Sequence, residues 1–200
     1  QLISLVIPKE KFFISNAVNI LDFDHFKPQQ VNKNFDLIYC GYMDKNKQVG
    51  LILDAFITLQ QSHPEVTMIL VGDGPERQSL EAKVNHAGLS QQVSFVGKQP
   101  YQAIPDFLNQ SRIFVMASAF EGLPVAMIEA LSCGLPVVVP DVGDIRDLAI
   151  HKYNAWLLKE SSPDAITEAL FQIINDQELY QTLQAGAFET RSKFVETFTI

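Results

Sequence analysis

The chain alternates short apolar runs with segments in which apolar residues recur at spacings of three and four. The apolar runs are expected to form strands at 35–40, 66–71, 93–96, 113–116, 136–139 and 155–158. The periodic segments are expected to form helices at 49–61, 75–87, 103–109, 124–133, 145–149, 163–175 and 178–194. Strands that are apolar nearly throughout must be covered on both faces, as in parallel sheets with crossover helices. The pattern therefore predicts the α/β class: a Rossmann-like, doubly wound parallel sheet of about six strands with two closing helices.

The first 34 residues do not share this alternation. Residues 11–14 are expected to form a short strand, and the polar stretch 27–34 is expected to form a linker. The chain begins at Gln1 without an initiator Met or a signal-peptide pattern. We therefore expect 1–34 to be a lead-in and linker from a missing N-terminal domain, and 35–200 to be one Rossmann-like domain.

The composition narrows the classes of partner. The 15 Lys and Arg residues stand against 23 Asp and Glu residues, which gives a formal net charge of −8. So acidic a chain argues against nucleic acid, whose phosphates need clustered cations, and against direct docking on anionic lipid. No apolar run approaches the ~20 residues of a membrane span, so no direct membrane insertion is expected. Cys40 and Cys133, both in apolar stretches, are expected to be buried reduced thiols in a cytoplasmic protein.

Glycines follow the expected strands. Ligands of doubly wound sheets bind beyond the carboxyl ends of the strands, where glycine lets the backbone approach a ligand closely. The glycines in these loops are Gly41, Gly72, Gly74, Gly97, Gly122 and Gly143. We therefore expect a ligand crevice along this edge of the sheet.

The segment 120–130 carries the most specific chemistry. Glu121 is expected in the loop after a strand, and Pro124 at the start of a helix whose amides point at the same crevice. A helix N-terminus is a ready anion site, so a diphosphate could rest on the amides near 122–125. Glu129 lies in an otherwise apolar part of this helix, where a carboxylate is rare unless it has a partner. An ionised carboxylate only accepts hydrogen bonds, which suits sugar or ribose hydroxyls.

Glu121 and Glu129 match the Glu-x7-Glu motif of family 4 glycosyltransferases, which are retaining enzymes of the GT-B fold (glycosyl transferases group 1). The chain resembles the C-terminal, nucleotide-sugar-binding domain of that family. Further segments that match in order and spacing are 16–19, 26–28, 71–76, 95–97, 134–138 and 141–143. The resemblance covers nearly the whole chain and makes 35–200 a donor-binding domain.

The resemblance implies roles for individual residues. Glu121 would contact the donor sugar, Glu129 would bind the ribose hydroxyls, and Lys47 would bind the diphosphate. Glu121 and Lys47 are the candidate catalytic residues, because a lysine there can neutralise charge on the leaving diphosphate. Lys45 is a neighbouring competitor for that role. The other donor-binding candidates are Gly41, Tyr42, Gly72, Gly74, Gly97, Lys98, Gly122, Leu123, Pro124 and Val125.

Two positions depart from the family pattern. Tyr42 stands where the family usually has arginine, so one cation is missing from the diphosphate site and no bidentate fork replaces it. Lys98 could substitute for it. Asp144 stands where a second glycine is common, which could narrow the sugar pocket. These changes point to an unusual donor or to weakened activity.

The function that the resemblance implies is a retaining, hexosyltransferase-like glycosyltransferase of polysaccharide biosynthesis. Its donor would be a nucleotide-diphosphate sugar, most commonly a UDP-sugar, with no cofactor and no metal. A glycan or lipid-linked acceptor would bind the missing N-terminal domain, which could also attach the protein to the membrane surface. We expect the 200 residues alone to bind nucleotide without transferring sugar.

Two other functions stay open. An NAD-dependent oxidoreductase needs Gly-x-Gly-x-x-Gly in the first βα turn, but Gly41 is followed by Tyr42-Met43-Asp44. A non-catalytic nucleotide-binding or interaction module would retain the fold and lose the chemistry, and Tyr42 is its best support. The sequence Asp22-Phe23-Asp24 resembles a metal–nucleotide motif of another glycosyltransferase fold, yet in the lead-in it is better interpreted as turn or capping aspartates. The four histidines show no ligand spacing.

Overall fold

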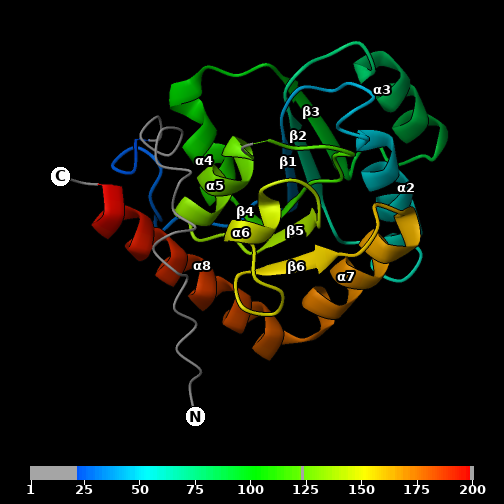
Figure 1. Cartoon of the computed structure of the whole chain (residues 1–200). Coiled ribbons are helices and arrows are strands. Elements are labelled where there is room, and N and C mark those ends of the chain that lie inside the picture. The colour runs from blue at the N-terminus through cyan, green and yellow to red at the C-terminus, as the bar shows by residue number, and fades with distance from the viewer. Residues whose placement is uncertain (1–21, 123, 199–200) are drawn as a thin grey trace.

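The computed structural model describes residues 22–122 and 124–198, and it is built around a six-stranded parallel sheet (Figure 1). The strands are β1 (Phe35–Cys40), β2 (Met68–Val71), β3 (Val93–Gly97), β4 (Ser111–Val115), β5 (Val137–Pro140) and β6 (Ala155–Leu158). Every pair of neighbours is parallel, and the strand order is β3-β2-β1-β4-β5-β6. This order is that of a doubly wound sheet, as the alternation of the sequence predicts.

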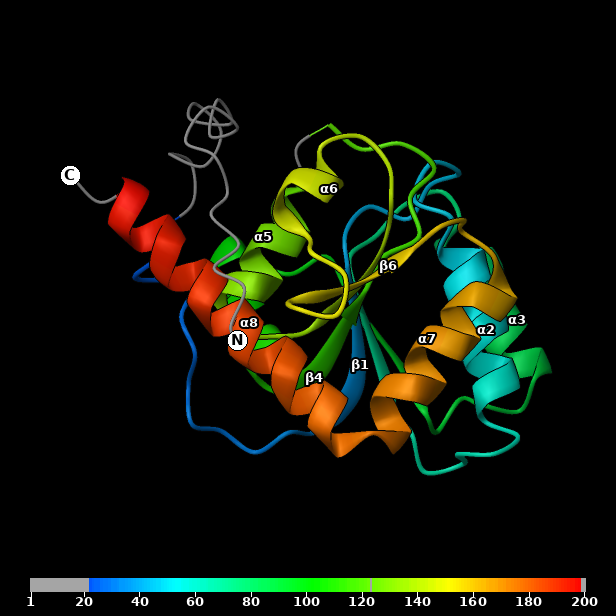
Figure 2. The same cartoon turned by 60° about the horizontal axis from the view of Figure 1, so that its bottom comes forward.

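Helices cover both faces of the sheet. They are α2 (Val49–Leu59), α3 (Arg77–His86), α4 (Ile104–Asn109), α5 (Val125–Ser132), α6 (Ile145–Leu148), α7 (Pro163–Asn175) and α8 (Gln177–Phe198), with a 3₁₀ turn η2 (Tyr101–Ala103) before α4. Helices α2, α3 and α7 lie on one side of the sheet, and α4 and α5 on the other (Figure 1). The long α8 runs along the molecule, with its first turns against one layer and its last turns against the other (Figure 2).

The apolar strands form two cores because successive residues of a strand point to opposite faces. Leu37 and Tyr39 of β1 pack in the core under α2 and α7, whereas Ile38 packs in the core under α5. All three side chains are buried. The consecutive apolar residues of β1 are thereby explained, because neither face of the strand meets water at these positions.

Several element boundaries differ from the sequence prediction. The predicted 66–71 strand starts late: the Val66 amide closes a turn by donating to the His63 carbonyl at 3.2 Å, and β2 begins at Met68. The helix expected from Pro75 begins at Arg77, with Glu76 as its N-cap, since the first intrahelical bond runs from the Leu80 amide to the Glu76 carbonyl at 3.0 Å. Pro124 is the N-cap of α5 and not its first residue. The strand expected at 11–14 lies outside the described residues.

The described part of the lead-in is a turn followed by an extended segment. The Asp22 carboxylate accepts hydrogen bonds from the amides of Asp24 and His25, both at 3.0 Å. Asp22 is therefore a turn aspartate, as predicted.

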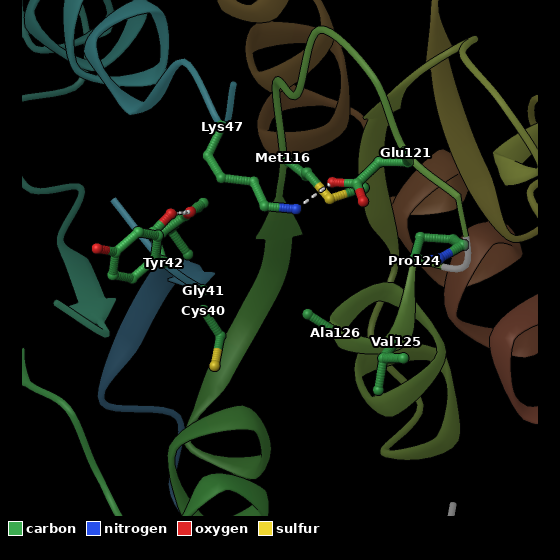
Figure 3. A pocket seen from close by; sticks show the side chains of 10 residues that line it. Cys40, Gly41, Tyr42, Lys47, Met116, Glu121, Pro124, Val125 and Ala126 are labelled. Carbon is green, nitrogen blue, oxygen red and sulfur yellow. Dashed lines mark hydrogen bonds and ion pairs between the residues drawn. The ribbon is translucent and has the colours of Figure 1, made fainter. Parts of the chain in front are cut away.

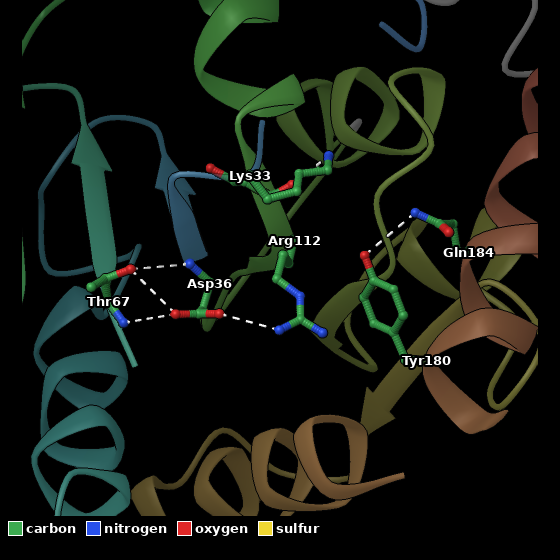
Figure 4. A network of polar contacts seen from close by, with 7 residues as sticks. Lys33, Asp36, Thr67, Arg112, Tyr180 and Gln184 are labelled. Atoms are coloured by element: carbon green, nitrogen blue, oxygen red, sulfur yellow. Dashed lines mark hydrogen bonds and ion pairs between the residues drawn. The ribbon is translucent and has the colours of Figure 1, made fainter. Parts of the chain in front are cut away.

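A polar network ties the amino-terminal ends of the strands (Figure 4). The Asp36 carboxylate of β1 accepts from the Thr67 amide at 3.0 Å and from Arg112 of β4 at 3.4 Å. The Arg112 guanidinium also lies over the ring of Tyr180 from α8, 5.0 Å from its centroid. This network lies at the edge opposite the glycine loops, so it stabilises the sheet without entering the crevice.

The strand order reverses between β1 and β4. In open parallel sheets, ligands bind at the carboxyl edge where the order reverses, because the loops there diverge to opposite faces and leave a crevice. The loops in question are 41–48 after β1 and 116–124 after β4. They carry Lys47 and Glu121.

Candidate functional site

A half-open cavity of about 210 Å³ lies at the carboxyl ends of β1 and β4 (Figure 3). Its lining residues are Tyr39, Cys40, Gly41, Tyr42, Lys47, Met116, Glu121, Pro124, Val125 and Ala126. The structure thus brings together the predicted candidates of the first loop, of the 120–125 segment and of the helix start. Tyr39, Cys40, Met116 and Ala126 were missed, because in the sequence they are ordinary apolar positions of strands and a helix.

An ion pair closes one side of the cavity. Lys47 and Glu121 point toward one another across the end of β4, and Lys47 Nζ lies 2.7 Å from Glu121 Oε1 (Figure 3). Only 8% of the Glu121 side chain is exposed, against 26% for Lys47. Because both side chains are largely buried, the effective dielectric constant around them is lower than in water. This charge-assisted bond is therefore stronger than one in open water. In the free chain, each of the two candidate catalytic residues therefore neutralises the other.

The loop that carries Lys47 is a tight turn. The Asp44 Oδ1 atom accepts hydrogen bonds from the amides of Asn46 and Lys47, both at 3.0 Å. Gln48, the next residue, has a φ of 49°, a left-handed conformation that costs a non-glycine residue about 1–3 kcal/mol. Such a backbone persists only where its surroundings hold it, so the position of Lys47 is built into the fold.

Tyr42, the departure from the family pattern, lies at the rim of the cavity. Its side chain is 58% exposed. Its carbonyl accepts a hydrogen bond of 2.8 Å from the hydroxyl of Tyr39, whose ring is buried beneath it. Burial raises the pKa of Tyr39, which therefore stays a neutral donor. The loop after β1 is thus supported from below by a tyrosine that sequence reasoning did not single out.

Glu129 is held quite differently from Glu121. It is 7% exposed and does not line the cavity. Cys40, which does, has a pKa raised by burial and, as a smaller cause, by the charge of Glu129. Burial raises the pKa of Glu129 itself to about 7. Within the described residues no hydrogen bond or ion pair reaches its carboxylate. Glu129 is therefore a buried acid next to the cavity wall that titrates near neutral pH.

The remaining glycine candidates lie outside the cavity lining. A Cβ on Gly72 would come 1.8 Å from the Gly41 carbonyl oxygen, and one on Gly74 would come 2.3 Å from that of Met43. These two glycines let the loop after β2 pack against the loop that borders the cavity. Gly97 lies beside the Arg77 guanidinium, and Lys98 is exposed.

At the turn before α5, Gly122 is exposed with open space around it, and Leu123 lies outside the described residues. Asp144, the other departure from the family pattern, is exposed at the N-cap of α6 without a side-chain capping bond. The donor-binding roles of all these residues stay predictions.

The described residues hold no group of three or more His, Cys, Asp and Glu side chains that could bind a metal ion. Both cysteines are free thiols, Cys133 buried and Cys40 half-buried, and burial raises the pKa of each to about 12. Among the helices of 22–122 and 124–198, none has the length and apolar character to cross a membrane.

Comparison with known proteins gives the family. The sequence profile of glycosyl transferases group 1 matches residues 22–190. An uncharacterized glycosyltransferase of Methanocaldococcus jannaschii is 27% identical over 161 residues, which cover 80% of this chain and 44% of that protein. The chain therefore spans less than half the length of this relative.

Two solved structures share the fold. The C-terminal domain of a glycosyl transferase group 1 family protein (LpcC) from Francisella tularensis has a TM-score of 0.78 at 22% identity, covering 86% of this chain and 97% of that one. Anabaena HepE, crystallised in complex with UDP and glucose, has a TM-score of 0.75 at 22% identity, covering 90% of this chain and 55% of HepE. The Rossmann-like sheet thus matches GT-B glycosyltransferase structures, as predicted.

Proposed function

The chain belongs to the glycosyl transferases group 1 family, and on that premise we propose that it is the donor-binding part of a retaining, family 4 glycosyltransferase. The observation that carries the proposal is the meeting of Lys47 and Glu121 in one cavity, beside the start of α5. These two side chains come from loops 74 residues apart in sequence. Family membership leaves no support for an NAD-dependent oxidoreductase.

In the proposed complex the diphosphate of the donor lies between Lys47 and the amides at the start of α5. A helix N-terminus and an ammonium group are complementary to a diphosphate. To reach it, Lys47 Nζ exchanges the Glu121 carboxylate for phosphate oxygens. Glu121, released from the ion pair, then accepts hydrogen bonds from the sugar hydroxyls. Glu129 accepts hydrogen bonds from the ribose.

The reaction that this arrangement serves is transfer with retention at the anomeric carbon. Charge builds on the leaving diphosphate as its bond to the sugar breaks, and Lys47 stabilises that charge where it develops. A UDP-sugar is the proposed donor, in line with the UDP complex of HepE. We propose that no metal is needed, since Lys47 and the helix supply the positive potential.

The cavity explains why the chain alone is expected to bind nucleotide without transferring sugar. At about 210 Å³ it is smaller than the roughly 300–1,000 Å³ of complete small-molecule sites. It fits as one wall of a cleft whose other wall, with the glycan or lipid-linked acceptor, belongs to an N-terminal domain. A cytoplasmic location and a role in polysaccharide biosynthesis are parts of the same proposal.

The test is thermal unfolding with UDP, GDP, ADP and NAD in turn. A ligand at about 100 times its dissociation constant stabilises by about 2.7 kcal/mol, which raises the midpoint of such a domain by roughly 5–10 °C. We expect UDP to give this rise, and Lys47→Ala to weaken UDP binding by about 10- to 100-fold, since a charge-assisted phosphate contact is lost.

Lys83→Ala is the matched control, because Lys83 makes an ion pair of the same 2.7 Å with Asp54 away from the cavity. It should leave the UDP response unchanged. A rise with NAD alone would contradict the proposal. If no nucleoside diphosphate raised the unfolding midpoint, a non-catalytic module would be favoured. The exposed Tyr42 supports that alternative, because it places no cation at its position on the rim of the cavity.

A further inference from the structure

Besides the Lys47–Glu121 bond, Asn46 makes two hydrogen bonds from the loop after β1 to the loop after β4. Its side-chain Nδ2 donates to the Phe120 carbonyl at 3.0 Å, and its own carbonyl accepts from the Ala119 amide at 2.8 Å. We call this pair of bonds the Asn46 clip. It reaches across 74 residues of sequence between two loops that leave the sheet from neighbouring strands.

The clip acts next to the ion pair on both sides. Asn46 directly precedes Lys47, and Phe120 directly precedes Glu121. The ladder between β1 and β4 ends at Ile38 and Phe114, well before either loop reaches its charged residue. A side chain that joins the two backbones at this point therefore fixes the separation of the Lys47 and Glu121 backbones.

The chemistry of the position favours asparagine. The Phe120 carbonyl needs a donor, which the amide Nδ2 supplies and a carboxylate cannot. The side chain of Asn46 is exposed, so its loss leaves no cavity in the core. Asp44 holds the Asn46 amide from the other side at 3.0 Å, which leaves the side chain free to face the second loop.

We propose that Asn46 is a positioning residue of the donor site, which acts by holding Lys47 over the cavity opposite Glu121. This inference rests on the proposed function, because it assigns Asn46 to the diphosphate grip of that site. The residue touches neither the sugar nor the phosphates. Its effect passes through Lys47.

The first test needs no nucleotide. Acetylation of the free protein with an amine-reactive ester, read at Lys47 by mass spectrometry, reports how firmly its amine is held. Asn46→Ala and the isosteric Asn46→Asp should make Lys47 react about 2- to 5-fold faster, the range set by a partly exposed ion pair. Asn175→Ala is the matched control, because Asn175 Nδ2 also donates to a phenylalanine carbonyl, that of Phe171, at 2.9 Å. If Lys47 were acetylated at the same rate in the wild type and in all three variants, the Asn46 clip would not hold Lys47 and the proposal would be wrong.

The second test is a double-mutant cycle on UDP binding by calorimetry. Asn46→Ala should weaken UDP binding about 3- to 10-fold in the wild-type background, and should have no effect once Lys47 is alanine, because coupled residues are not additive. An equal loss in both backgrounds would mean a merely structural role and overturn the proposal. A wild-type chain that binds no nucleoside diphosphate would refute the proposed function and the donor role of Asn46 together. Acetylation would still decide whether the clip holds Lys47.

Discussion

Burial of Glu129 should make the stability of this protein fall as pH rises through the neutral range. The pKa of Glu129 is raised from an ordinary 4.5 to about 7 by burial. The folded chain therefore holds a proton that the unfolded chain releases, so stability is greatest below pH 4.5 as far as this group is concerned. It declines between pH 4.5 and pH 7, and reaches its lower plateau above pH 7.

The magnitude follows from the size of the shift. Each pKa unit is worth about 1.4 kcal/mol, so ionised Glu129 lowers the free energy of unfolding by about 3 kcal/mol above pH 7. Glu129→Gln removes the charge and retains the shape. A buried amide without partners costs about 1–3 kcal/mol, but it costs the same at every pH. The difference between variant and wild type should therefore change by about 3 kcal/mol in favour of the variant between pH 5 and pH 8.

The assay is denaturant or thermal unfolding of both proteins at pH 5, 6, 7 and 8. For a domain of this size the change corresponds to roughly 6–12 °C in the midpoint. Glu160→Gln is the control, because it makes the same chemical change at an exposed carboxylate. If the Glu129→Gln difference did not change with pH, the buried carboxylate would be ionised at no cost, and a hydrogen-bond donor would have to reach it.

Two further substitutions test the loops around the cavity. Gly143→Ala should destabilise the protein by more than Gly88→Ala does, and it should also weaken UDP binding. Both glycines have a positive φ. Only at Gly143 would the new Cβ meet backbone, because it would lie 1.8 Å from the Glu121 carbonyl oxygen. Thermal unfolding and calorimetry check this, and equal effects would refute it. Tyr39→Phe should cost about 1 kcal/mol and weaken UDP binding as the loop loosens, whereas Tyr153→Phe, which loses a bond to Glu189 far from the cavity, should affect stability alone.

The fold and the general place of the site could be predicted from sequence because both depend on local patterns. Apolar runs that fill both faces of a strand specify a parallel sheet, and the glycines at their ends mark one edge of it. Boundaries were less accurate, because the periodicity of apolar residues does not mark which residue caps a helix. The helix expected at Pro75 starts at Arg77, and its first intrahelical bond runs from the Leu80 amide to the Glu76 carbonyl.

The contacts within the site could not be predicted, because they join loops far apart in the chain. Nothing in the order of residues shows that Lys47 rather than Lys45 meets Glu121, or that Asn46 bonds to Phe120. The Asx turn at Asp44 determines which lysine meets Glu121, because it directs Lys47 toward the cavity. Lys98 illustrates the reverse case: it is exposed in the loop after β3, a strand two places away from β1 in the sheet.

The two glutamates of the Glu-x7-Glu motif differ before a ligand binds, because Glu121 forms an ion pair and Glu129 forms none within the described residues. Glu121 already has a cationic partner, so a diphosphate that takes Lys47 exchanges one charge-assisted bond for another. The net gain from this exchange is smaller than the loss on removing Lys47, because Lys47→Ala would also leave the Glu121 carboxylate unpaired beside the diphosphate. Within 22–122 and 124–198 no cation pairs with the buried Glu129, so hydroxyls that donate to it would relieve a cost that the ligand-free chain carries. In the proposed complex, nucleoside recognition at Glu129 would then supply more of the binding energy. The exchange at Lys47 and Glu121 would set the geometry of the reacting groups.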